Sequence, residues 1–255
     1  MATTHYGARF LCDARDTIQS MIMHFGVWEP DVSRIIHDHL TEGDVVVDIG
    51  ANIGYDTLLA ASLVGRTGRV VAIEASPQTY EHLKRNLRLN PELAVNVRTV
   101  NVAVAEAPGS LDLYGFGAAN IGGTTTLPGR GGSFIATIDA LPIDEILTTA
   151  EVSRARLIKL DVEGAEPPIL RHIAERIDDY PSNMEIIVEA NTQDDFAAWN
   201  DVFERLRTAG FAAFAIANRY DVQWYLQCKP TSLTCIEGTP TERTDVLFTR
   251  QPELV

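Results

Sequence analysis

Cysteine is scarce in this chain of 255 residues, and the few cysteines form neither a disulfide framework nor a metal-ligand pattern. Cys12, Cys228 and Cys235 are odd in number and lack the paired spacing of zinc ligands. Their simplest interpretation is as reduced thiols, which persist in the cytoplasm. We therefore expect a cytoplasmic protein.

Long apolar runs and basic segments are also lacking. No apolar stretch approaches the ~20 residues of a membrane span, and no basic segment precedes an apolar one at the N-terminus. We expect neither a membrane partner nor a signal peptide. The net charge of −14, without a basic stripe, argues against a nucleic-acid partner. The net charge does not exclude a small anionic substrate, because one pocket can be locally positive.

The chain does contain 45% apolar residues and a regular alternation of strand-like and helix-like segments. Its length fits one large α/β domain or two small ones, and we expect a single domain over residues 1–255. The alternation favours a mainly parallel sheet with helices on both faces and an antiparallel edge strand. The expected strands are 45–49, 69–74, 95–104, 156–161 and 185–189, with 211–217 and 246–250 closing the sheet. The expected helices are 32–40, 55–64, 77–89, 142–147, one opened by Pro167, and 194–209.

Three segments lie outside this alternation. Residues 110–138 resemble a hairpin around a loop, 115–133, that is rich in Gly, Thr and Asn and is either a lid or passive surface. Residues 218–245 form a long connection whose aromatic and polar side chains at 219–225 suit a sugar face, or else a small satellite core. We expect both insertions on the substrate side. Residues 1–40 supply either a packing helix or a cover over the cofactor pocket.

The most informative stretch runs from Val45 to Gly54, where an apolar strand ends in Asp48, Gly50 and Asn52. A continuous apolar run is typical of a strand buried on both faces of a parallel sheet. A strand, a glycine turn and a helix N-terminus let a ligand lie against bare backbone. Asp48 would repel a pyrophosphate and attract a cationic cofactor. The dehydrogenase pattern G-x-G-x-x-G and the phosphate-binding pattern G-x-x-x-x-G-K-[ST] are both absent.

Two further residues extend this cofactor site along the edge of the expected sheet. Glu74 ends the second strand, where an acid can accept hydrogen bonds from both hydroxyls of a ribose. Asn101 lies at the end of the third strand, where an adenine would be met. The predicted cofactor-binding residues are Asp48, Gly50, Asn52, Gly54, Glu74, Asn101 and Asp161.

Charged residues alternate where the fourth strand ends. Lys159, Asp161 and Glu163 can point to one side, because alternate strand residues share a face. Charges in an apolar strand are costly unless they are paired or wet, which favours a functional role over a lysine–carboxylate pair that only satisfies itself. Glu189 ends the fifth strand at the same edge of the sheet. The predicted catalytic residues are Asp161, Lys159, Glu163 and Glu189.

These carboxylates allow either a metal site or a general base. Asp161 and Glu189, with Asn191, supply the oxygen ligands that Mg²⁺ prefers, so magnesium bound by Asp161 and Glu189 is one prediction. Without a metal, Asp161 or a nearby histidine such as His24 would act as the general base. The remaining histidines on expected helices are interpreted as surface or packing residues: His37, His39, His82 and His172.

Four segments together resemble the FkbM family of S-adenosylmethionine-dependent methyltransferases: 48–54, 70–74, 101–104 and 158–166. The last segment contains the specific signature Asp-Val-Glu-Gly-Ala-Glu, and residues 26–30 resemble the family's upstream segment. The resemblance implies a Rossmann-like class I methyltransferase fold and methylation of a hydroxyl oxygen, often on sugars or polyketide-derived molecules. The whole chain is also similar to sugar O-methyltransferases of methylmannose polysaccharide biosynthesis.

The resemblance therefore implies an O-methyltransferase that uses S-adenosylmethionine and acts on a small-molecule hydroxyl, with a sugar as the expected acceptor. An NAD-dependent oxidoreductase is one alternative, because an acid after the second strand would also suit its ribose, but the glycine spacing disfavours it. A cofactor-binding protein without turnover is another alternative. The intact set of Lys159, Asp161 and Glu163 argues against it, although fold alone would not.

Overall fold

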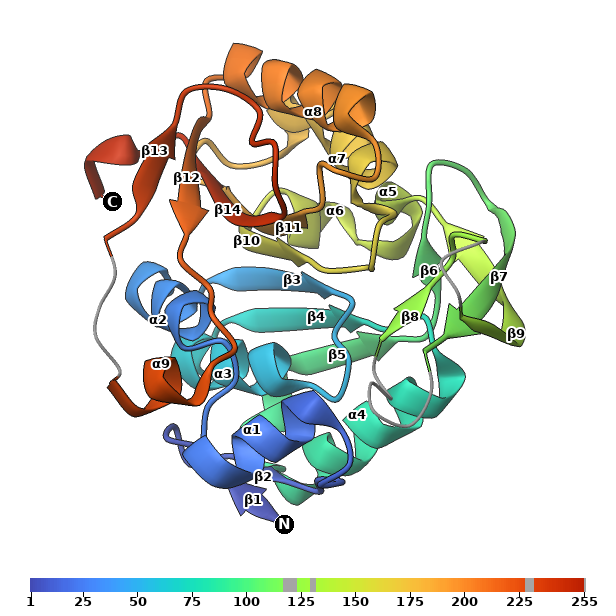
Figure 1. Ribbon diagram of the computed structural model, residues 1–255, viewed down its shortest axis with the longest axis vertical. Coiled ribbons are helices and arrows are strands. Elements are labelled where there is room, and N and C mark those ends of the chain that lie inside the picture. The colour runs from blue at the N-terminus through green and yellow to red at the C-terminus, as the bar shows by residue number, and fades with distance from the viewer. Residues whose placement is uncertain (117–122, 129–131, 228–231, 255) are drawn as a thin grey trace.

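The computed structural model describes residues 1–116, 123–128, 132–227 and 232–254 (Figure 1). Cys228 and parts of the two predicted insertions lie outside these residues. Cys12 and Cys235 are free thiols. Among the described helices, none has both the length and the apolar character that a membrane span requires.

The described residues place eight strands in one central sheet, in the order β13-β12-β14-β11-β10-β3-β4-β5. The five strands from β11 to β5 in this order are parallel to one another. The predicted α/β fold with a mainly parallel sheet is therefore confirmed. The strands are β3 (Val45–Ile49), β4 (Arg69–Ile73), β5 (Val97–Val100), β10 (Ala155–Leu160), β11 (Glu185–Ala190), β12 (Ala212–Ile216), β13 (Thr234–Ile236) and β14 (Thr244–Thr249).

The sheet has the predicted antiparallel edge strand, but this strand is not one of the two segments predicted to close the sheet. β14 runs antiparallel between β11 and β12, so it is internal, and its residues Val246, Leu247 and Phe248 are buried. The antiparallel edge strand is β13, which pairs with β12 and was not predicted as a strand. Three half-buried or exposed residues give β13 little apolar alternation from which to recognise it.

Helices cover both faces of the sheet, because alternate strand residues point to opposite sides (Figure 1). Val47 and Ile49 of β3 share a core with Trp199 of α8, whereas Val46 shares the opposite core with Leu58 of α3. Each fully buried side chain of this size contributes about 1.5–3 kcal/mol of hydrophobic free energy. The first face carries α5 (Ile143–Ile146), α6 (Thr149–Val152), α7 (Glu166–Glu175) and α8 (Phe196–Thr208); the second carries α1 (Thr17–Phe25), α2 (Pro30–His39), α3 (Tyr55–Val64) and α4 (Pro77–Leu89).

The predicted strand 95–104 is wrong as a single element. It is divided into a 3-10 turn η1 (Ala94–Asn96), β5 and β6 (Ala103–Val104), and β6 belongs to a second sheet. The break falls at Asn101, whose side-chain amide donates to the carbonyls of Glu74 and Ala75 at 2.7 and 3.0 Å. These bonds turn the chain out of the central sheet directly after β5.

The second sheet has the order β6-β9-β7-β8 and lies beside the ends of β3, β4 and β10 (Figure 1). Its centre is an antiparallel hairpin of β7 (Gly109–Gly115) and β9 (Ser133–Leu141). The short strand β8 (Thr124–Thr125) is joined to the loop after β10, because the Thr125 hydroxyl donates to the Glu163 carbonyl at 2.9 Å. This bond fixes the small sheet against the carboxyl edge of the central one.

The N-terminal segment packs against a segment that is distant in the sequence. It comprises the strand pair β1 (Ala2–Thr3) and β2 (Arg9–Phe10), then α1 and α2. Helix α9 (Val222–Gln227) contacts it through Trp224, whose indole N–H donates to Asp31 at 2.8 Å. The Tyr225 ring lies 5.1 Å from that of Phe25. The N-terminal segment and the connection between β12 and β13 therefore meet on one side of the protein. Two further 3-10 turns are η2 (Ile177–Asp179) and η3 (Pro252–Leu254).

Candidate functional site

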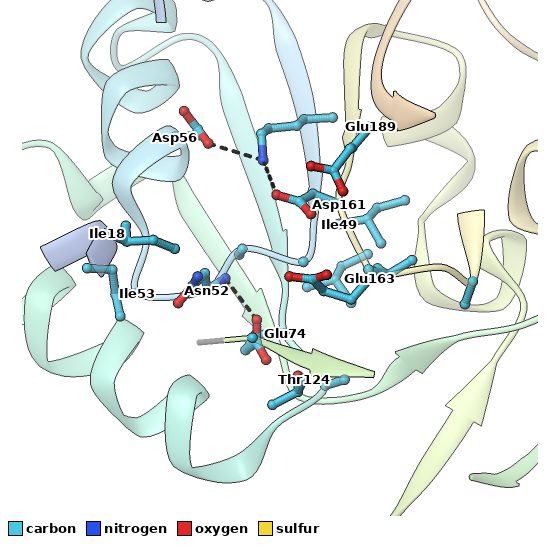
Figure 2. A pocket seen from close by; sticks show the side chains of 18 of the residues that line it. Ile18, Ile49, Asn52, Ile53, Asp56, Glu74, Thr124, Asp161, Glu163 and Glu189 are labelled. Atoms are coloured by element: carbon cyan, nitrogen blue, oxygen red, sulfur yellow. Dashed lines mark hydrogen bonds and ion pairs between the residues drawn. The ribbon is translucent and has the colours of Figure 1, made fainter. Parts of the chain in front are cut away.

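A cavity of about 380 Å³ lies at the carboxyl ends of β3, β4, β10 and β11 (Figure 2). The strand order reverses between β3 and β10, because β4 and β5 extend from one side of β3 and β10 lies on the other. Open α/β sheets bind ligands at such a reversal. Figure 2 shows the cavity extending from Glu74 and Thr124 at one end to Asp56, Asp161 and Glu189 at the other.

The glycine turn after β3 brings bare backbone against the loop after β10. Gly50 has φ +83°, and a Cβ placed there would lie 1.8 Å from the carbonyl oxygen of Asp161. The backbone N–H groups of Gly50 and Ala51 both donate to the Ile73 carbonyl, at 2.9 and 3.0 Å. Glycine is therefore required at position 50 for its conformation and for the close approach of two strand ends.

Glu74 is held rigidly at one end of the cavity. Its carboxylate accepts from the backbone N–H of Asn52 and of Ser76, each at 2.8 Å, and the residue is only 4% exposed. Burial raises the pKa of Glu74 to about 7, and the two N–H donors lower it in part. An ionised carboxylate has about four acceptor positions, so each oxygen retains capacity for a ligand hydroxyl.

Lys159 links two carboxylates at the opposite end (Figure 2). Its Nζ lies 3.2 Å from Asp56 Oδ2 and 3.3 Å from Asp161 Oδ2. Burial lowers the pKa of Lys159, but Asp161, Asp56 and Asp48 outweigh burial and raise this pKa well above its usual range. The Asp56 Oδ1 atom is buried without a hydrogen-bond partner. Lys159 therefore stays charged and fixes the position of Asp161, while Asp56 retains an acceptor for a cationic ligand.

A second polar group borders this end. The Tyr220 hydroxyl donates to Glu29 Oε1 at 2.8 Å, and Arg243 forms an ion pair with Glu189. Burial is the largest cause that raises the pKa of Glu29 and of Glu189 to about 8 each and that of Asp245 to about 6. Among the described residues that line the cavity, six are acidic and two, Lys159 and Arg243, are cationic. This excess of acidic over basic side chains suits a cationic ligand, whose charge would favour their ionised forms.

The cavity carboxyls lead to a prediction about stability and pH. We expect the ligand-free protein to lose thermal stability as the pH rises from about 5 to about 8. The folded-state pKa values of Glu29, Glu74 and Glu189 are raised, so the folded protein keeps protons that the unfolded chain has already released. The stabilising contribution of these three carboxyls is fully present below their pKa values in the unfolded chain. It is lost as the pH rises through their pKa values in the folded protein.

Thermal denaturation across this pH range tests the prediction. Glu29→Gln should reduce the fall in Tm. Glu81→Gln is the matched control, because the hydrogen bond with Lys84 lowers the pKa of Glu81, in the direction opposite to the cavity carboxyls. A Tm that stays constant or increases between these pH values contradicts the prediction.

The structure brings most of the predicted site residues to this cavity. Asp48, Gly54 and Asn101 are predicted cofactor-binding residues that do not line it. Asp48 is buried behind the glycine turn and accepts from the Thr57 hydroxyl, and Gly54 caps α3. The side-chain amide of Asn101 donates hydrogen bonds to backbone carbonyls, and the neighbouring residues Val102 and Ala103 line the cavity. The predicted residues that do line it are Gly50, Asn52, Glu74, Lys159, Asp161, Glu163 and Glu189.

The structure gives the predicted magnesium site no support. Glu189 is paired with Arg243 and Asp161 with Lys159, so cations of the chain already neutralise both proposed ligands. Asn191 does not line the cavity, and no cluster of three potential metal ligands occurs among the described histidines, cysteines and acidic residues. His24 is exposed on α1, where its ring bonds to the Ser20 carbonyl, so it is not at the site.

The other histidines lie away from the cavity. His37 is exposed and pairs with Asp38, and His82 bonds to the Leu11 carbonyl. His172 pairs with Asp144 at 2.7 Å. His39 lies at the opposite edge of the sheet, 2.8 Å from the buried carboxylate of Glu185.

The sequence interpretation missed several residues of the site. The tertiary fold adds Trp28, Glu29, Asp56, Tyr220 and Arg243 to the cavity lining. Asp56 has a local signal, because it lies in the first turn of the helix that follows the glycine turn. Trp28 and Glu29 lie in the upstream segment used for the family resemblance, and Tyr220 in the predicted aromatic insertion, but nothing in the sequence places these two segments together.

Glu166 has a different role from its neighbours in the signature. Its Oε1 atom accepts from the backbone N–H groups of Val162 and Gly164, each at 3.0 Å. Burial raises the pKa of Glu166 to about 7. Glu163 has φ +57°, a left-handed conformation that is uncommon for a residue with a side chain, and the two hydrogen bonds to Glu166 hold this loop. Glu166 therefore holds the backbone of the loop that contains Glu163, and it does not line the cavity.

Comparisons with known proteins indicate a methyltransferase family. A family model described as the methyltransferase FkbM domain matches residues 48–212. Hexuronic acid methyltransferase AglP of Haloferax volcanii is 29% identical over 167 residues, which is 65% of this chain and 64% of that protein. The chain thus matches less than two thirds of that relative. Protein-L-isoaspartate O-methyltransferase of Caenorhabditis elegans is 42% identical over 53 residues, 21% of this chain and 24% of that protein.

Solved structures share the fold at low sequence identity. Methyltransferase FkbM from Methylobacillus flagellatus superposes with a TM-score of 0.51 and 18% identity, over 93% of this chain and 56% of that one. A putative rRNA methylase from Clostridium thermocellum has a TM-score of 0.50 and 14% identity, over 86% of this chain and 92% of that one. The fold is that of the class I methyltransferases.

Proposed function

Because the chain belongs to the FkbM family of S-adenosylmethionine-dependent methyltransferases, we propose that it transfers a methyl group to a hydroxyl oxygen of a small molecule, namely a sugar or oligosaccharide. The observation that carries this proposal is the acidic cavity, with Glu74 at one end and the Lys159–Asp161 pair beside Glu189 at the other (Figure 2). The name of the hexuronic acid methyltransferase among its relatives supports a sugar acceptor.

The residues present fit S-adenosylmethionine. Glu74 would accept hydrogen bonds from the ribose hydroxyls, and Val102 and Ala103 would flank the adenine. The backbone at Gly50 allows close approach, and the unpartnered Oδ1 of Asp56 suits the cationic methionine end. When bound, this cofactor would supply a methyl group on a cationic sulfur, and the sulfur would leave as a neutral thioether. In this proposal Asp56 attracts the cationic cofactor, a role that the sequence analysis had assigned to Asp48.

Asp161 is the proposed general base. Lys159 binds its Oδ2 atom, which leaves Oδ1 to accept the proton of the acceptor hydroxyl. Glu163 and Glu189 line the cavity on either side and would orient the hydroxyl through hydrogen bonds. Alignment of the reacting groups can remove several kcal/mol, about 7 at the lower end, from such a barrier. The residues therefore act mainly by positioning, with one proton transfer.

Transfer of label tests the proposed function. The protein is incubated with S-adenosylmethionine labelled in the methyl group and a panel of sugars, polyols, phenols and hydroxylated peptides. Product carrying label on oxygen is the expected result. Calorimetry in parallel measures affinity for S-adenosylmethionine and for NAD. Tighter binding of NAD than of S-adenosylmethionine would contradict the proposal and favour an oxidoreductase. Binding of S-adenosylmethionine without turnover of any acceptor in the panel would contradict it and favour a non-catalytic protein.

Replacing Glu74 by alanine should weaken binding of S-adenosylmethionine by about ten- to a hundredfold, since charge-assisted hydrogen bonds contribute about 1.5–3 kcal/mol each. Isothermal titration calorimetry measures the change. Glu81→Ala, an exposed carboxylate on α4, is the control and should bind normally. The loss of Glu74 also orphans two backbone N–H groups, so circular dichroism must first show that the variant is folded. Unchanged affinity in a folded Glu74→Ala protein would reject the ribose role.

A further inference from the structure

Two aromatic rings from distant parts of the chain form one wall of the cavity. Trp28 and Tyr220 both line it, and their rings are stacked, with centroids 5.3 Å apart and an interplanar angle of 27°. Tyr220 is nevertheless 41% exposed. The wall therefore leaves aromatic surface uncovered in the ligand-free protein.

Polar contacts fix this wall in position. The Tyr220 hydroxyl donates to Glu29 and accepts from the side-chain amide of Asn218 at 3.1 Å. Trp224 anchors the same segment to α2 through Asp31, and the Arg219 guanidinium lies 4.9 Å from the centre of the Trp224 ring. A surface held in this way loses little conformational freedom when a ligand binds.

The wall lies at the acceptor end of the cavity and not at the ribose end. Glu29, which receives the Tyr220 hydrogen bond, borders a small void together with Asp161, Glu189 and Lys159. Figure 2 places Asp161 and Glu189 at the end opposite Glu74. A ligand group beside Tyr220 would therefore also lie beside the proposed general base.

The chemistry of this end favours a particular acceptor. A pyranose has an apolar face, which an aromatic ring covers, and a rim of hydroxyls, which carboxylates accept. An anionic acceptor would add charge beside Glu29, Asp161 and Glu189. The guanidinium of Arg243 is already paired with Glu189, so it does not offset a second carboxylate. Burial, with a smaller contribution from neighbouring carboxylates, already raises the pKa values of Glu29 and Glu189, and it would disfavour an ionised carboxylate of the acceptor in the same way.

We infer that Trp28 and Tyr220 are specificity-determining residues that bind the apolar face of an uncharged sugar, and that the same end of the cavity rejects a hexuronate. This inference rests on the proposed function, because it places the sugar hydroxyl at Asp161. It goes beyond that function in naming the residues that bind the sugar and the charge of the acceptor.

Binding and turnover are measured with paired acceptors. The probes are the methyl glycosides of glucose, galactose and mannose, each compared with the corresponding hexuronate. Ligand-observed NMR in the presence of S-adenosylhomocysteine measures binding without turnover, and labelled S-adenosylmethionine measures kcat/KM. We expect at least one neutral glycoside to bind and to exceed its hexuronate by about tenfold or more, a difference of about 1.4 kcal/mol. Equal or better binding of the hexuronates, or no binding by any neutral glycoside, overturns the inference.

Variants assign the effect to the wall. Tyr220→Ala should raise the dissociation constant and KM for the neutral glycoside by about tenfold, with affinity for S-adenosylmethionine unchanged. Tyr220→Phe keeps the ring and should retain most of the sugar affinity. Phe196→Ala removes an exposed aromatic ring outside the cavity and should change neither value. Trp28→Leu provides a second test if Tyr220→Ala is misfolded.

The outcomes separate the two proposals. Sugar binding that depends on Tyr220 but gives no labelled product supports the acceptor wall and contradicts methyl transfer. Labelled product on an acceptor whose binding does not change in Tyr220→Ala supports methyl transfer and overturns the wall.

Discussion

Replacing Asp161 by asparagine should lower turnover by about two to four orders of magnitude, the range that general acid–base catalysis usually contributes. Asparagine has nearly the same volume and keeps an oxygen that can accept from Lys159, which lies 3.3 Å from Asp161 Oδ2. It cannot take the proton of an acceptor hydroxyl at neutral pH. Single-turnover measurement with labelled S-adenosylmethionine separates the chemical step from product release.

The matched control for this variant is Asp201→Asn. Asp201 also pairs with basic side chains, Arg171 and Arg205, but it is a surface residue of α8 and does not line the cavity. It should have normal turnover. Affinity for S-adenosylmethionine should change little in either variant, because Asp161 is expected to act on the acceptor. An Asp161→Asn enzyme with a rate within about threefold of the original would exclude general-base catalysis by this residue.

Gly50→Ala should destabilise the fold by about 3 kcal/mol or more and abolish cofactor binding. The new Cβ would lie 1.8 Å from the Asp161 carbonyl oxygen, so the ends of β3 and β10 would have to separate. This separation would also displace Asp161 from Lys159. Urea denaturation measures the loss of stability, and calorimetry with S-adenosylmethionine measures the loss of binding.

Gly210→Ala isolates the conformational part of this effect. Gly210 has φ +90°, close to that of Gly50, but a Cβ added there would meet no atom within 4 Å. Alanine there incurs only the cost of left-handed backbone, about 1 kcal/mol. If Gly50→Ala proves no more destabilising than Gly210→Ala, the close approach of the two strand ends is not what requires glycine at position 50.

The elements that the sequence predicted well are those whose signal is local. The apolar run 45–49 is buried on both faces, as a continuous run predicts, and becomes β3 in the middle of the sheet. The alternation of strands and helices was enough to predict the α/β fold. The prediction of one strand over 95–104 was wrong, because hydrogen bonds from the Asn101 side chain to another loop lie where the strand ends. No local sequence pattern reveals these bonds.

The residues of the candidate site likewise differ in whether a local sequence signal predicts them. Residues directly after strands, such as Gly50, Glu74 and Asp161, could be found because parallel strands present their carboxyl ends at one edge. The magnesium prediction rested on the type of residue and on the shared edge of the sheet. It did not foresee that Arg243, directly before the antiparallel strand β14, pairs with Glu189. The position of Asp48 likewise depends on which way its side chain turns behind the glycine loop.

By itself, the sequence determined the strand–turn–helix units, the acidic residues that follow the strands and the family resemblance, because each depends on neighbours only a few positions apart. The tertiary structure alone decided which carboxylates meet around Lys159 and how Trp28 and Tyr220 come to stack. The hydrogen bond from Tyr220 to Glu29, for example, joins residues 191 positions apart. The geometry of such contacts follows from packing of whole elements, and local patterns do not encode it.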